Sequence, residues 1–273
     1  MLLAVDVGNT NIVLGIFRGD VLTVSWRLAT LRDRTADELR VLVGRLFAES
    51  GLDMAEVTGV VTASVVPSLT TTVTEMARGA FHREAVSIDS TNVGIPIDYR
   101  TPADVGADRL VNAVAAVAEY GRAGRPVIVV DFGTATTFDV VSVAGHYVGG
   151  VICPGVEISA DALFQRAARL PRVDVHRPER LIGTSTVDSM RSGLYFGYVA
   201  MVEGVVARLR DALGEGPAAV CVATGGLAAT IAHETSTIDH VNLDLTLHGL
   251  RRVWSGIGAR DDEQDERSPR PSD

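Results

Sequence analysis

"VDVGNTN" (residues 5–11) lies near the start of the chain and joins two apolar runs. Residues 2–5 are typical of a strand that leads into Asp6, and a second strand pattern, residues 12–17, follows Gly8 at once. One interpretation is a β-hairpin whose turn needs Gly and Asn. The other is a phosphate-binding loop, because Gly8 lets a ligand approach the backbone and successive amides can converge on an anion.

Asp6 extends the second interpretation to a metal ion. Mg²⁺ keeps several waters and takes one or two carboxylates, so an aspartate at the end of a strand can hold it directly or through water. Asn9, Thr10 and Asn11 add donors to the same turn. Taken alone, this pattern does not separate a metal-phosphate loop from an ordinary turn.

The Val-Asp-x-Gly pattern returns at 130–133, at the start of the second half of the chain. Each copy ends a buried strand pattern, leads into another strand and is followed by small hydroxyl or amide residues. This similarity suggests two related lobes that face a cleft. The alternative is two unrelated hairpins.

The second copy opens "DFGTATTFD" (131–139), where threonine hydroxyls and amides gather after Gly133. Asp131 is a candidate metal ligand or base, and Thr134, Thr136 and Thr137 are candidate ligand contacts. The threonines also fit plain β-propensity. A glycine turn, "ATGGLA" (223–228), could admit a flat ring against the backbone, or could be a simple strand-to-helix turn.

"VGADRLVN" (105–112) places Asp108 and Arg109 at the start of an apolar helix. An aspartate there can simply offset the helix dipole. Beside phosphate loops it has another use, because a carboxylate can take the proton from an attacking hydroxyl and an arginine can hold an anionic substrate.

Composition limits the possible functions. The chain has 273 residues, 47% hydrophobic, which favours two lobes with substantial cores. A formal net charge of -9 without a basic cluster argues against nucleic acid. No membrane span is expected, and a start inside a strand pattern, without a basic leader, predicts a cytoplasmic protein. The absence of lysine excludes the P-loop and the protein-kinase lysine.

The remaining pattern predicts strands that alternate with helices. A capping box at Thr35 and Glu38 opens one helix and Pro67 opens the next. Helices are predicted at 35–49, 67–78, 106–121, near 156–170, 186–213 and 243–257. Strands are predicted within 2–28 (three), at 57–65, 126–133, 137–143, 146–152 and 218–226, with 84–105 irregular and a disordered tail after 258.

The order of these motifs resembles the type III pantothenate kinases of the acetate kinase, sugar kinase, Hsp70 and actin superfamily. The resemblance covers about residues 2–257. It is carried by "DVGNTN" (6–11), "GADRLVNA" (106–113), "VVDFGTATTFDVV" (129–141), "GGVICPGV" (149–156), "LPRV" (170–173), "TVDSMRSGLYFGYVAMVEG" (186–204) and "ATGGLA" (223–228).

This resemblance implies an α/β fold with two related actin-like, ribonuclease H-like lobes, mixed sheets flanked by helices and an ATP cleft between them. The expected lobes are 1–121 and 122–258, followed by the tail 259–273. The implied reaction is ATP-dependent phosphorylation of pantothenate, the first step of coenzyme A synthesis. ATP, Mg²⁺ and a monovalent cation, K⁺ or NH₄⁺, are the implied cofactors, and a homodimer is the implied assembly.

The resemblance also implies roles for individual residues. Asp108 is the expected catalytic base, Asp6 the magnesium carboxylate and Asp131 the monovalent-cation ligand. The expected ATP contacts are Asp6, Val7, Gly8, Asn9, Thr10, Asn11, Ile12, Val13 and Thr134. The expected pantothenate contacts are Tyr99, Gly106, Ala107, Asp108, Arg109 and Thr186. Ser185 and Arg191 depart from the family's usual Asn and Gln.

Two other functions stay open at this level, because a fold does not fix a function. A non-catalytic regulator on the same fold would not need Asp6, Asp108, Asp131 and Thr134 together. A phosphatase or nucleotide hydrolase would activate water and would not require an anion-holding pair such as Asp108 and Arg109.

Overall fold

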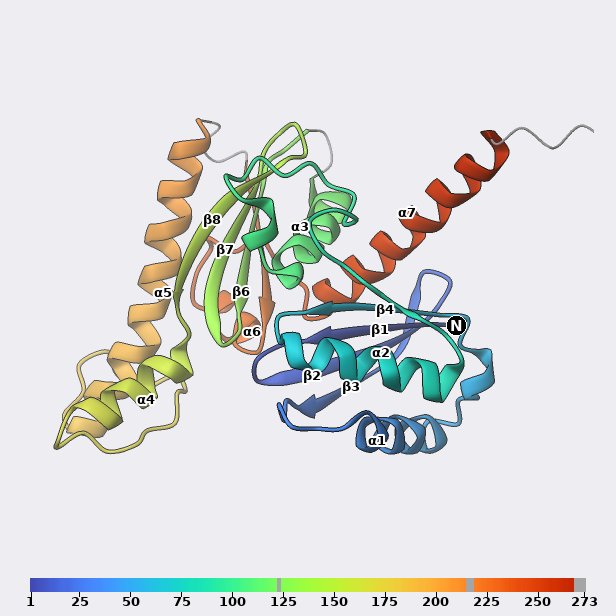
Figure 1. Ribbon diagram of the computed structural model, residues 1–273. Coiled ribbons are helices and arrows are strands. Elements are labelled where there is room, and N and C mark those ends of the chain that lie inside the picture. The colour runs from blue at the N-terminus through green and yellow to red at the C-terminus, as the bar shows by residue number, and fades with distance from the viewer. Residues whose placement is uncertain (122–123, 215–218, 268–273) are drawn as a thin grey trace, which may run out of the picture. The chain divides into compact units, whose positions relative to one another are not determined.

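The computed structural model describes residues 1–121, 124–214 and 219–267, with side chains described as far as Gly258 (Figure 1). The chain forms two compact units. The first contains Met1–Ala115 together with the C-terminal helix α7 (Leu245–Arg267), and the second is Ala116–Asp244.

The first unit contains a five-stranded mixed sheet in the order β3-β2-β1-β4-β5. β1, β2 and β3 form an antiparallel meander, and β4 and β5 run parallel to β1. The strands are β1 (Leu2–Val7), β2 (Asn11–Arg18), β3 (Val21–Ala29), β4 (Gly59–Ser64) and β5 (Ala85–Ser87).

Helices cover both faces of this sheet. α1 (Ala36–Glu49) and α2 (Pro67–Phe81) pack together and bury one face, with Phe47, Leu69 and Met76 in the core. α1 begins at Thr35, whose side chain and Glu38 form the predicted capping box. α7 packs on β1, β2 and β4, where Gly15 and Gly59 leave room for side chains of the helix. Short 3-10 turns occupy Met54–Glu56 and Pro102–Asp104.

The second unit repeats the same strand order, β10-β9-β6-β7-β8. β6, β7 and β8 form the antiparallel meander, and β9 and β10 run parallel to β6 and to β9 respectively. Its strands are β6 (Val127–Phe132), β7 (Ala135–Val141), β8 (Tyr147–Pro154), β9 (Val220–Gly225) and β10 (His240–Val241). The predicted relation between the two halves is therefore confirmed, since β1 corresponds to β6 and β2 to β7.

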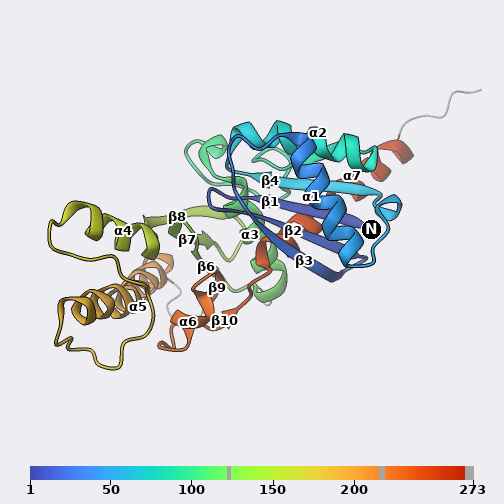
Figure 2. The same ribbon diagram turned by 90° about the horizontal axis from the view of Figure 1, so that it is seen from below.

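One long helix supplies much of the second unit's core. α5 (Thr186–Leu213) lies against the sheet and against α4 (Val156–Arg166), and Figure 2 shows both helices from below. Its Tyr195, Val202 and Val206 pack with Ile128 and Phe138 of the strands. α6 (Ala228–Ala232) follows β9, and α3 (Ala107–Tyr120) carries the chain from the first unit to the second.

Three sequence-based boundaries differ from the structure. The first lobe was expected to extend to residue 121, but the division between the units falls at Ala115 and Ala116, within α3. Residues 245–258 were expected in the second lobe, but α7 belongs to the first unit because its apolar side chains, such as Leu247 and Trp254, pack on that unit's sheet. α7 also continues to Arg267, because no proline interrupts its sequence before Pro269. The disorder predicted beyond that point falls on 268–273, which lie outside the described residues.

Three short elements were not predicted from the sequence. β5 lies within the segment expected to be irregular, and α6 and β10 follow the glycine turn at 225–226. Each of these elements has five residues or fewer. Segments this short do not develop a recognisable period, so tertiary pairing decides their conformation.

The crossing of α7 over α3 depends on Gly249. A Cβ at this position would lie 2.1 Å from the Val111 carbonyl oxygen, a backbone atom that cannot rotate away. We expect Gly249→Ala to lower the free energy of unfolding by roughly 1–3 kcal/mol through overpacking, measured by urea or thermal unfolding.

Gly256→Ala is the matched control in the same helix. Among the described residues, no heavy atom lies within 4 Å of the Cβ that it would add. The control should be neutral or stabilising by up to about 1 kcal/mol, because alanine favours helix. Equal stabilities of the two variants would contradict the proposed crossing.

Candidate active site

The first loop is a tight turn between β1 and β2. The Gly8 amide donates to the Asn11 carbonyl at 2.9 Å, and β1 and β2 pair on either side of the turn. A Cβ on Gly8 would lie 3.1 Å from the Asn11 oxygen, so the turn has little room for a side chain. The hairpin interpretation is therefore correct as geometry, and the same turn presents an exposed tip at Asn9 and Thr10.

The end of β3 holds this loop in place. The Thr30 hydroxyl donates to the Gly8 carbonyl at 2.7 Å, and the Thr30 amide donates to the Thr10 carbonyl at 2.9 Å. The Arg32 guanidinium donates to the Asn9 side-chain oxygen at 3.2 Å. The sequence did not identify Thr30 or Arg32, since their partners are 20 or more residues away along the chain.

The side chains of the predicted ATP loop do not all face the same way. Val7 and Ile12 are buried in the core of the first unit, so only their backbone can face a ligand. Asp6, Asn11 and Val13 are half-buried. The loop therefore offers backbone groups, the carboxylate of Asp6 at the end of β1, and the polar side chains at its tip.

Asp108 lies in the first turn of α3, folded back over Gly106. Its Oδ1 accepts a hydrogen bond from the Arg109 amide at 2.8 Å. A Cβ on Gly106 would lie 2.5 Å from that oxygen. Burial is the largest influence on this carboxyl and raises its pKa, while the Arg109 amide and guanidinium act in the opposite direction.

Val65 connects this carboxylate to the first loop. The Val65 amide donates to the Val7 carbonyl at 3.0 Å, and the Val65 side chain lies 3.4 Å from the position of a Cβ on Gly106. The start of α3 therefore lies at the carboxyl ends of β1 and β4, beside the residues that precede Gly8. The structure brings the predicted base and the predicted phosphate loop together within one unit.

Asp131 occupies the equivalent strand end in the second unit. Its neighbour across the β6–β9 pair is Thr224, which is followed by Gly225 with a φ of +89°. A Cβ on Gly225 would lie 2.6 Å from the Asp131 Oδ1 and equally close to the Phe132 carbonyl oxygen. The Asp131 carboxylate can therefore take this position only because residue 225 is a glycine, whether or not the turn also binds a flat ring.

The loop that follows Asp131 packs on the start of α4. Thr134 is exposed, and its carbonyl oxygen would be 2.2 Å from a Cβ on Gly155. Thr136 differs from the expectation that the threonines gather at one point. Its side chain lies on the buried side of the strand, fully enclosed, and among the described residues its hydroxyl makes no hydrogen bond.

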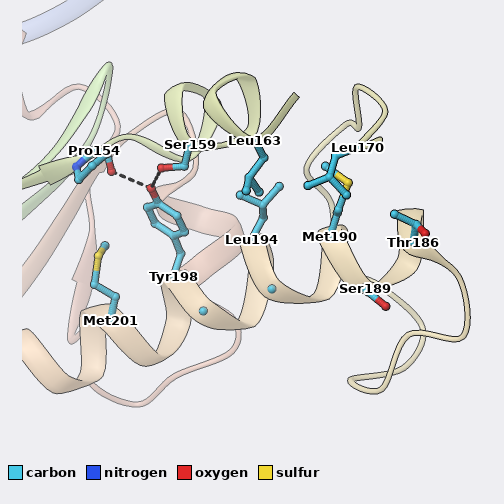
Figure 3. A pocket seen from close by; sticks show the side chains of 12 residues that line it. Pro154, Ser159, Leu163, Leu170, Thr186, Ser189, Met190, Leu194, Tyr198 and Met201 are labelled. Carbon is cyan, nitrogen blue, oxygen red and sulfur yellow. Dashed lines mark hydrogen bonds between the residues drawn. The ribbon is translucent and has the colours of Figure 1, made fainter. Parts of the chain in front are cut away.

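Thr186 lies elsewhere in the second unit, at the first residue of α5 and at one end of a groove between α4 and α5 (Figure 3). The groove has a volume of about 570 Å³ and a mostly apolar lining that includes Leu163, Leu170 and Leu194. At its other end the Tyr198 hydroxyl donates to the Pro154 carbonyl at 2.7 Å.

The groove contributes no charge that could hold an anion. Within the described part of the chain, none of the residues that line it is charged.

Ser185, which departs from the family's usual asparagine, caps α5 by accepting from the Asp188 amide at 3.1 Å. Serine and asparagine are both good N-caps, so this departure keeps the helix start.

The other predicted residues are distributed over the first unit. Gly106 precedes α3, Ala107 is its first residue, and Arg109 follows Asp108. Tyr99 is exposed, in the segment before Pro102. Among the described residues, no group of three or more His, Cys, Asp or Glu is arranged to hold a metal ion. No described helix has the length and apolar character needed to cross a membrane.

Known proteins resemble this chain over most of its length. A family profile, type III pantothenate kinase, matches residues 2–208. The type III pantothenate kinase of Moorella thermoacetica is 51% identical over 255 residues, which is 93% of this chain and 98% of that protein.

Solved structures agree on the fold. A Campylobacter jejuni protein described as a Baf family transcriptional activator aligns with a TM-score of 0.60 and 16% identity, over 94% of this chain and 99% of its own. The activator of 2-hydroxyisocaproyl-CoA dehydratase from Clostridium difficile, solved with bound ADPNP, aligns with a TM-score of 0.53 and 14% identity, over 99% of each chain.

The repeated mixed sheets, with the same strand order in both units, give the chain an α/β fold of the actin-like class. Within this class, the chain belongs to the type III pantothenate kinase family.

Gly106 should be essential for the position of the Asp108 carboxylate. Gly106→Ala would force the Asp108 carboxylate off the Arg109 amide, since the added methyl group needs the space of Oδ1. A displacement of about 1 Å can cost ~10²-fold in rate, so we expect turnover to fall by at least ~10-fold while KM for ATP changes little.

Gly44→Ala provides the control. A Cβ on Gly44, in α1, would meet only the Met54 sulfur at an ordinary 3.8 Å. Its turnover should equal that of the wild type. Full activity of Gly106→Ala would show that the Asp108 carboxylate does not need the position seen here.

Proposed function

We propose that this protein transfers the γ-phosphoryl group of ATP to the primary hydroxyl of pantothenate, giving 4'-phosphopantothenate and ADP. This phosphotransfer to an alcohol is the first step of coenzyme A synthesis, and we place it in the cytoplasm. The observation that carries the proposal is the Asp108 carboxylate, held over Gly106 beside the residues that lead into the first phosphate loop. Membership of the type III pantothenate kinase family supports it.

In the proposed reaction Asp108 acts as the general base. The pantothenate hydroxyl oxygen attacks the γ-phosphorus, its proton passes to the Asp108 carboxylate, and the bond between the γ-phosphorus and the ADP oxygen breaks. Because burial raises the pKa of Asp108, this carboxylate is a stronger base than an exposed aspartate, and such a group contributes roughly 10²–10⁴-fold to the rate.

The phosphates are proposed to lie against the two strand-end loops. In a chain without lysine, backbone amides, the hydroxyls of Thr10 and Thr134 and bound cations must supply the contacts. Asp6 fits Mg²⁺ because it is a half-buried carboxylate at the start of the first loop. One carboxylate suffices when waters and phosphates complete the shell, and the bound ion would neutralise phosphate charge.

Asp131 is proposed to hold the monovalent cation. Its carboxylate is seated against Gly225 at the end of β6, and its two strand neighbours, Thr137 and Thr224, both carry hydroxyl oxygens. This donor set fits a hard cation such as K⁺. When bound, the cation would supply positive charge near the second loop.

Pantothenate is an anion, and Arg109, next to the base, is the proposed partner of its carboxylate. A guanidinium recognises a carboxylate through two parallel hydrogen bonds. Tyr99 and Thr186 are the other proposed contacts. The uncharged groove beside Thr186 suits an apolar surface better than a carboxylate.

The test is to incubate the purified protein with ATP, Mg²⁺ and K⁺, with and without pantothenate, and to measure ADP. Release that requires pantothenate supports the kinase. Release without pantothenate would identify a nucleotide hydrolase, and no release in either mixture would favour the non-catalytic regulator.

Replacement of the base should separate catalysis from binding. Asp108→Asn keeps the shape but cannot accept the proton, so turnover should fall at least about 10²-fold while nucleotide binding, measured by calorimetry, is retained.

The variant should also unfold at a higher temperature than wild type near pH 8. Because the pKa of Asp108 is higher in the folded than in the unfolded state, the protonated carboxyl group contributes its full stabilisation below the ordinary aspartate range. This contribution is lost as the pH rises through the folded pKa.

Two results would contradict the role of Asp108. One is turnover close to wild type in Asp108→Asn. The other is a wild-type pH-rate profile whose acidic limb lies at or below the ordinary aspartate range, because the raised pKa should move that limb upward.

The expected homodimer finds support in α4 and the groove rather than in α5 itself. The apolar residues of α5, such as Tyr195 and Val202, are buried within their own unit. Apolar side chains of α4 are exposed instead, with Ile158 at 47%, Leu163 at 38% and Phe164 at 42%. Twofold closure is the commonest arrangement for such a surface.

Light scattering at micromolar concentration should therefore report about twice the chain mass of 28.9 kDa. Leu163→Glu places a charge in the groove and should give a monomer. Val41→Glu is the control, because Val41 is 69% exposed on α1 in the other unit. A fully active wild-type monomer would refute the dimer.

A further inference from the structure

Thr137 stands directly beside Asp131 in the second unit. The two residues are register partners in the antiparallel pair of β6 and β7. Directly opposed residues in such a pair project to the same face, with Cβ atoms about 4.5–5.5 Å apart. The side chain of Thr137 is therefore the nearest neighbour that β7 offers to the Asp131 carboxylate.

The equivalent aspartate of the first unit has different neighbours. Asp6 is paired with Val13 on β2 and Ala63 on β4, whereas Asp131 is paired with Thr137 on β7 and Thr224 on β9. The repeated fold thus provides the same position twice, once between apolar side chains and once between hydroxyls. Hydroxyls at both positions of one copy suggest a site that needs several protein oxygens.

Asp139 fixes the direction of the Thr137 hydroxyl. Asp139 is fully buried, two residues further along β7 on the same face. The Thr137 hydroxyl donates to Asp139 Oδ2 at 3.1 Å, and the Tyr147 hydroxyl, also fully buried, donates to Asp139 Oδ1 at 2.8 Å. Both oxygens of the carboxylate accept hydrogen bonds, so the O–H bond of Thr137 points toward Asp139.

A hydroxyl has one O–H donor and two lone pairs. When the O–H bond points toward one acceptor, the lone pairs point in other directions. Two oxygens with lone pairs, Thr137 Oγ1 and a carboxylate, repel each other unless a cation or a donor lies between them. K⁺ is bound in proteins by oxygen atoms that replace its hydration shell, and NH₄⁺ can donate to the same atoms. The hydrogen bond that Thr137 donates to Asp139 thus leaves the lone pairs of Thr137 Oγ1 available to a cation.

We infer that Thr137 Oγ1 is a second protein oxygen of the monovalent-cation site at Asp131, and that Asp139, held by Tyr147, is the positioning residue that turns its lone pairs toward the cation. This inference rests on the proposed cation site at Asp131. It adds a ligand, and a reason why a carboxylate is buried behind it.

Thr136 offers a matched control on the same strand. Its side chain lies on the opposite face, in the core, and its hydroxyl has no hydrogen bond among the described residues. Thr→Val at either position removes one hydroxyl and keeps the branched shape. Only the change at Thr137 should affect the cation.

The readout is thermal unfolding in KCl titrations, with NaCl holding ionic strength constant and without nucleotide or pantothenate. Wild type should be stabilised by K⁺ but not by Na⁺, since a ligand that binds only the folded state raises the unfolding temperature. Thr137→Val should raise the K⁺ midpoint at least ~10-fold and Thr137→Ser should restore it. Thr136→Val should keep the wild-type midpoint.

The outcomes separate the two levels of the proposal. If K⁺ and Na⁺ act alike on wild type, the cation site at Asp131 is wrong, and this inference with it. If wild type and Thr137→Val share one K⁺ midpoint while Asp131→Asn loses the K⁺ effect, the site stands and the role of Thr137 is wrong. Should Thr137→Val not fold, Thr137→Ala gives the same comparison without a branched side chain.

The role of Asp139 is tested in the same titration. Asp139→Asn lets its amide donate to Thr137, which frees the hydroxyl proton to point toward the cation. We expect the K⁺ midpoint to rise at least ~10-fold in this variant. A wild-type midpoint in folded Asp139→Asn would overturn the positioning role.

Discussion

Two carboxylates of the proposed site occupy space that only glycine leaves open. Asp108 Oδ1 lies 2.5 Å from where a Cβ of Gly106 would be, and Asp131 Oδ1 lies 2.6 Å from the equivalent position of Gly225. In both units the acidic group is therefore set against backbone rather than against a side chain. The backbone of Gly106 lies at the start of a helix and that of Gly225 at the end of a strand, so neither can move away from its carboxylate. The fold itself therefore determines where each carboxylate lies.

The internal repeat explains why related positions can take different roles. Asp6 and Asp131 end equivalent strands, but their register partners differ, with Val13 opposite the first and Thr137 opposite the second. An aspartate between apolar neighbours suits an ion that brings its own waters, as Mg²⁺ does. An aspartate between hydroxyls suits an ion that takes most of its ligands from the protein.

The sequence predicted the long elements and the strand-end loops well. Three strands before residue 30, the capping box at Thr35, the end of α3 just before Gly121 and both ends of α5 follow from local periodicity and capping residues. The assignment of α7 could not follow in this way. Its apolar side chains are compatible with either lobe, and the space beside Gly15 and Gly59 that Leu247 and Trp254 fill on the first sheet is seen only in the structure.

The candidate site shows the same division. The types of residue and their order made Asp6, Asp108 and Asp131 candidates, because carboxylates at strand and helix ends suit this chemistry. The supporting contacts did not follow, since Thr30 is held to Gly8 across 22 residues. A pattern also cannot separate Thr136 from Thr137, because strand alternation assigns opposite faces but does not say which face is the core.

Burial decides whether Asp108 is a useful base. Its place in the first turn of a helix and the hydrogen bond from the Arg109 amide both favour the ionised form, and alone they would lower its pKa and make it a weak base. Desolvation is the larger influence and reverses the sign. The hydrogen bond from the Arg109 amide thus fixes the orientation of the carboxylate, and desolvation raises its pKa. The same desolvation costs stability at neutral pH, which is a common arrangement at functional sites.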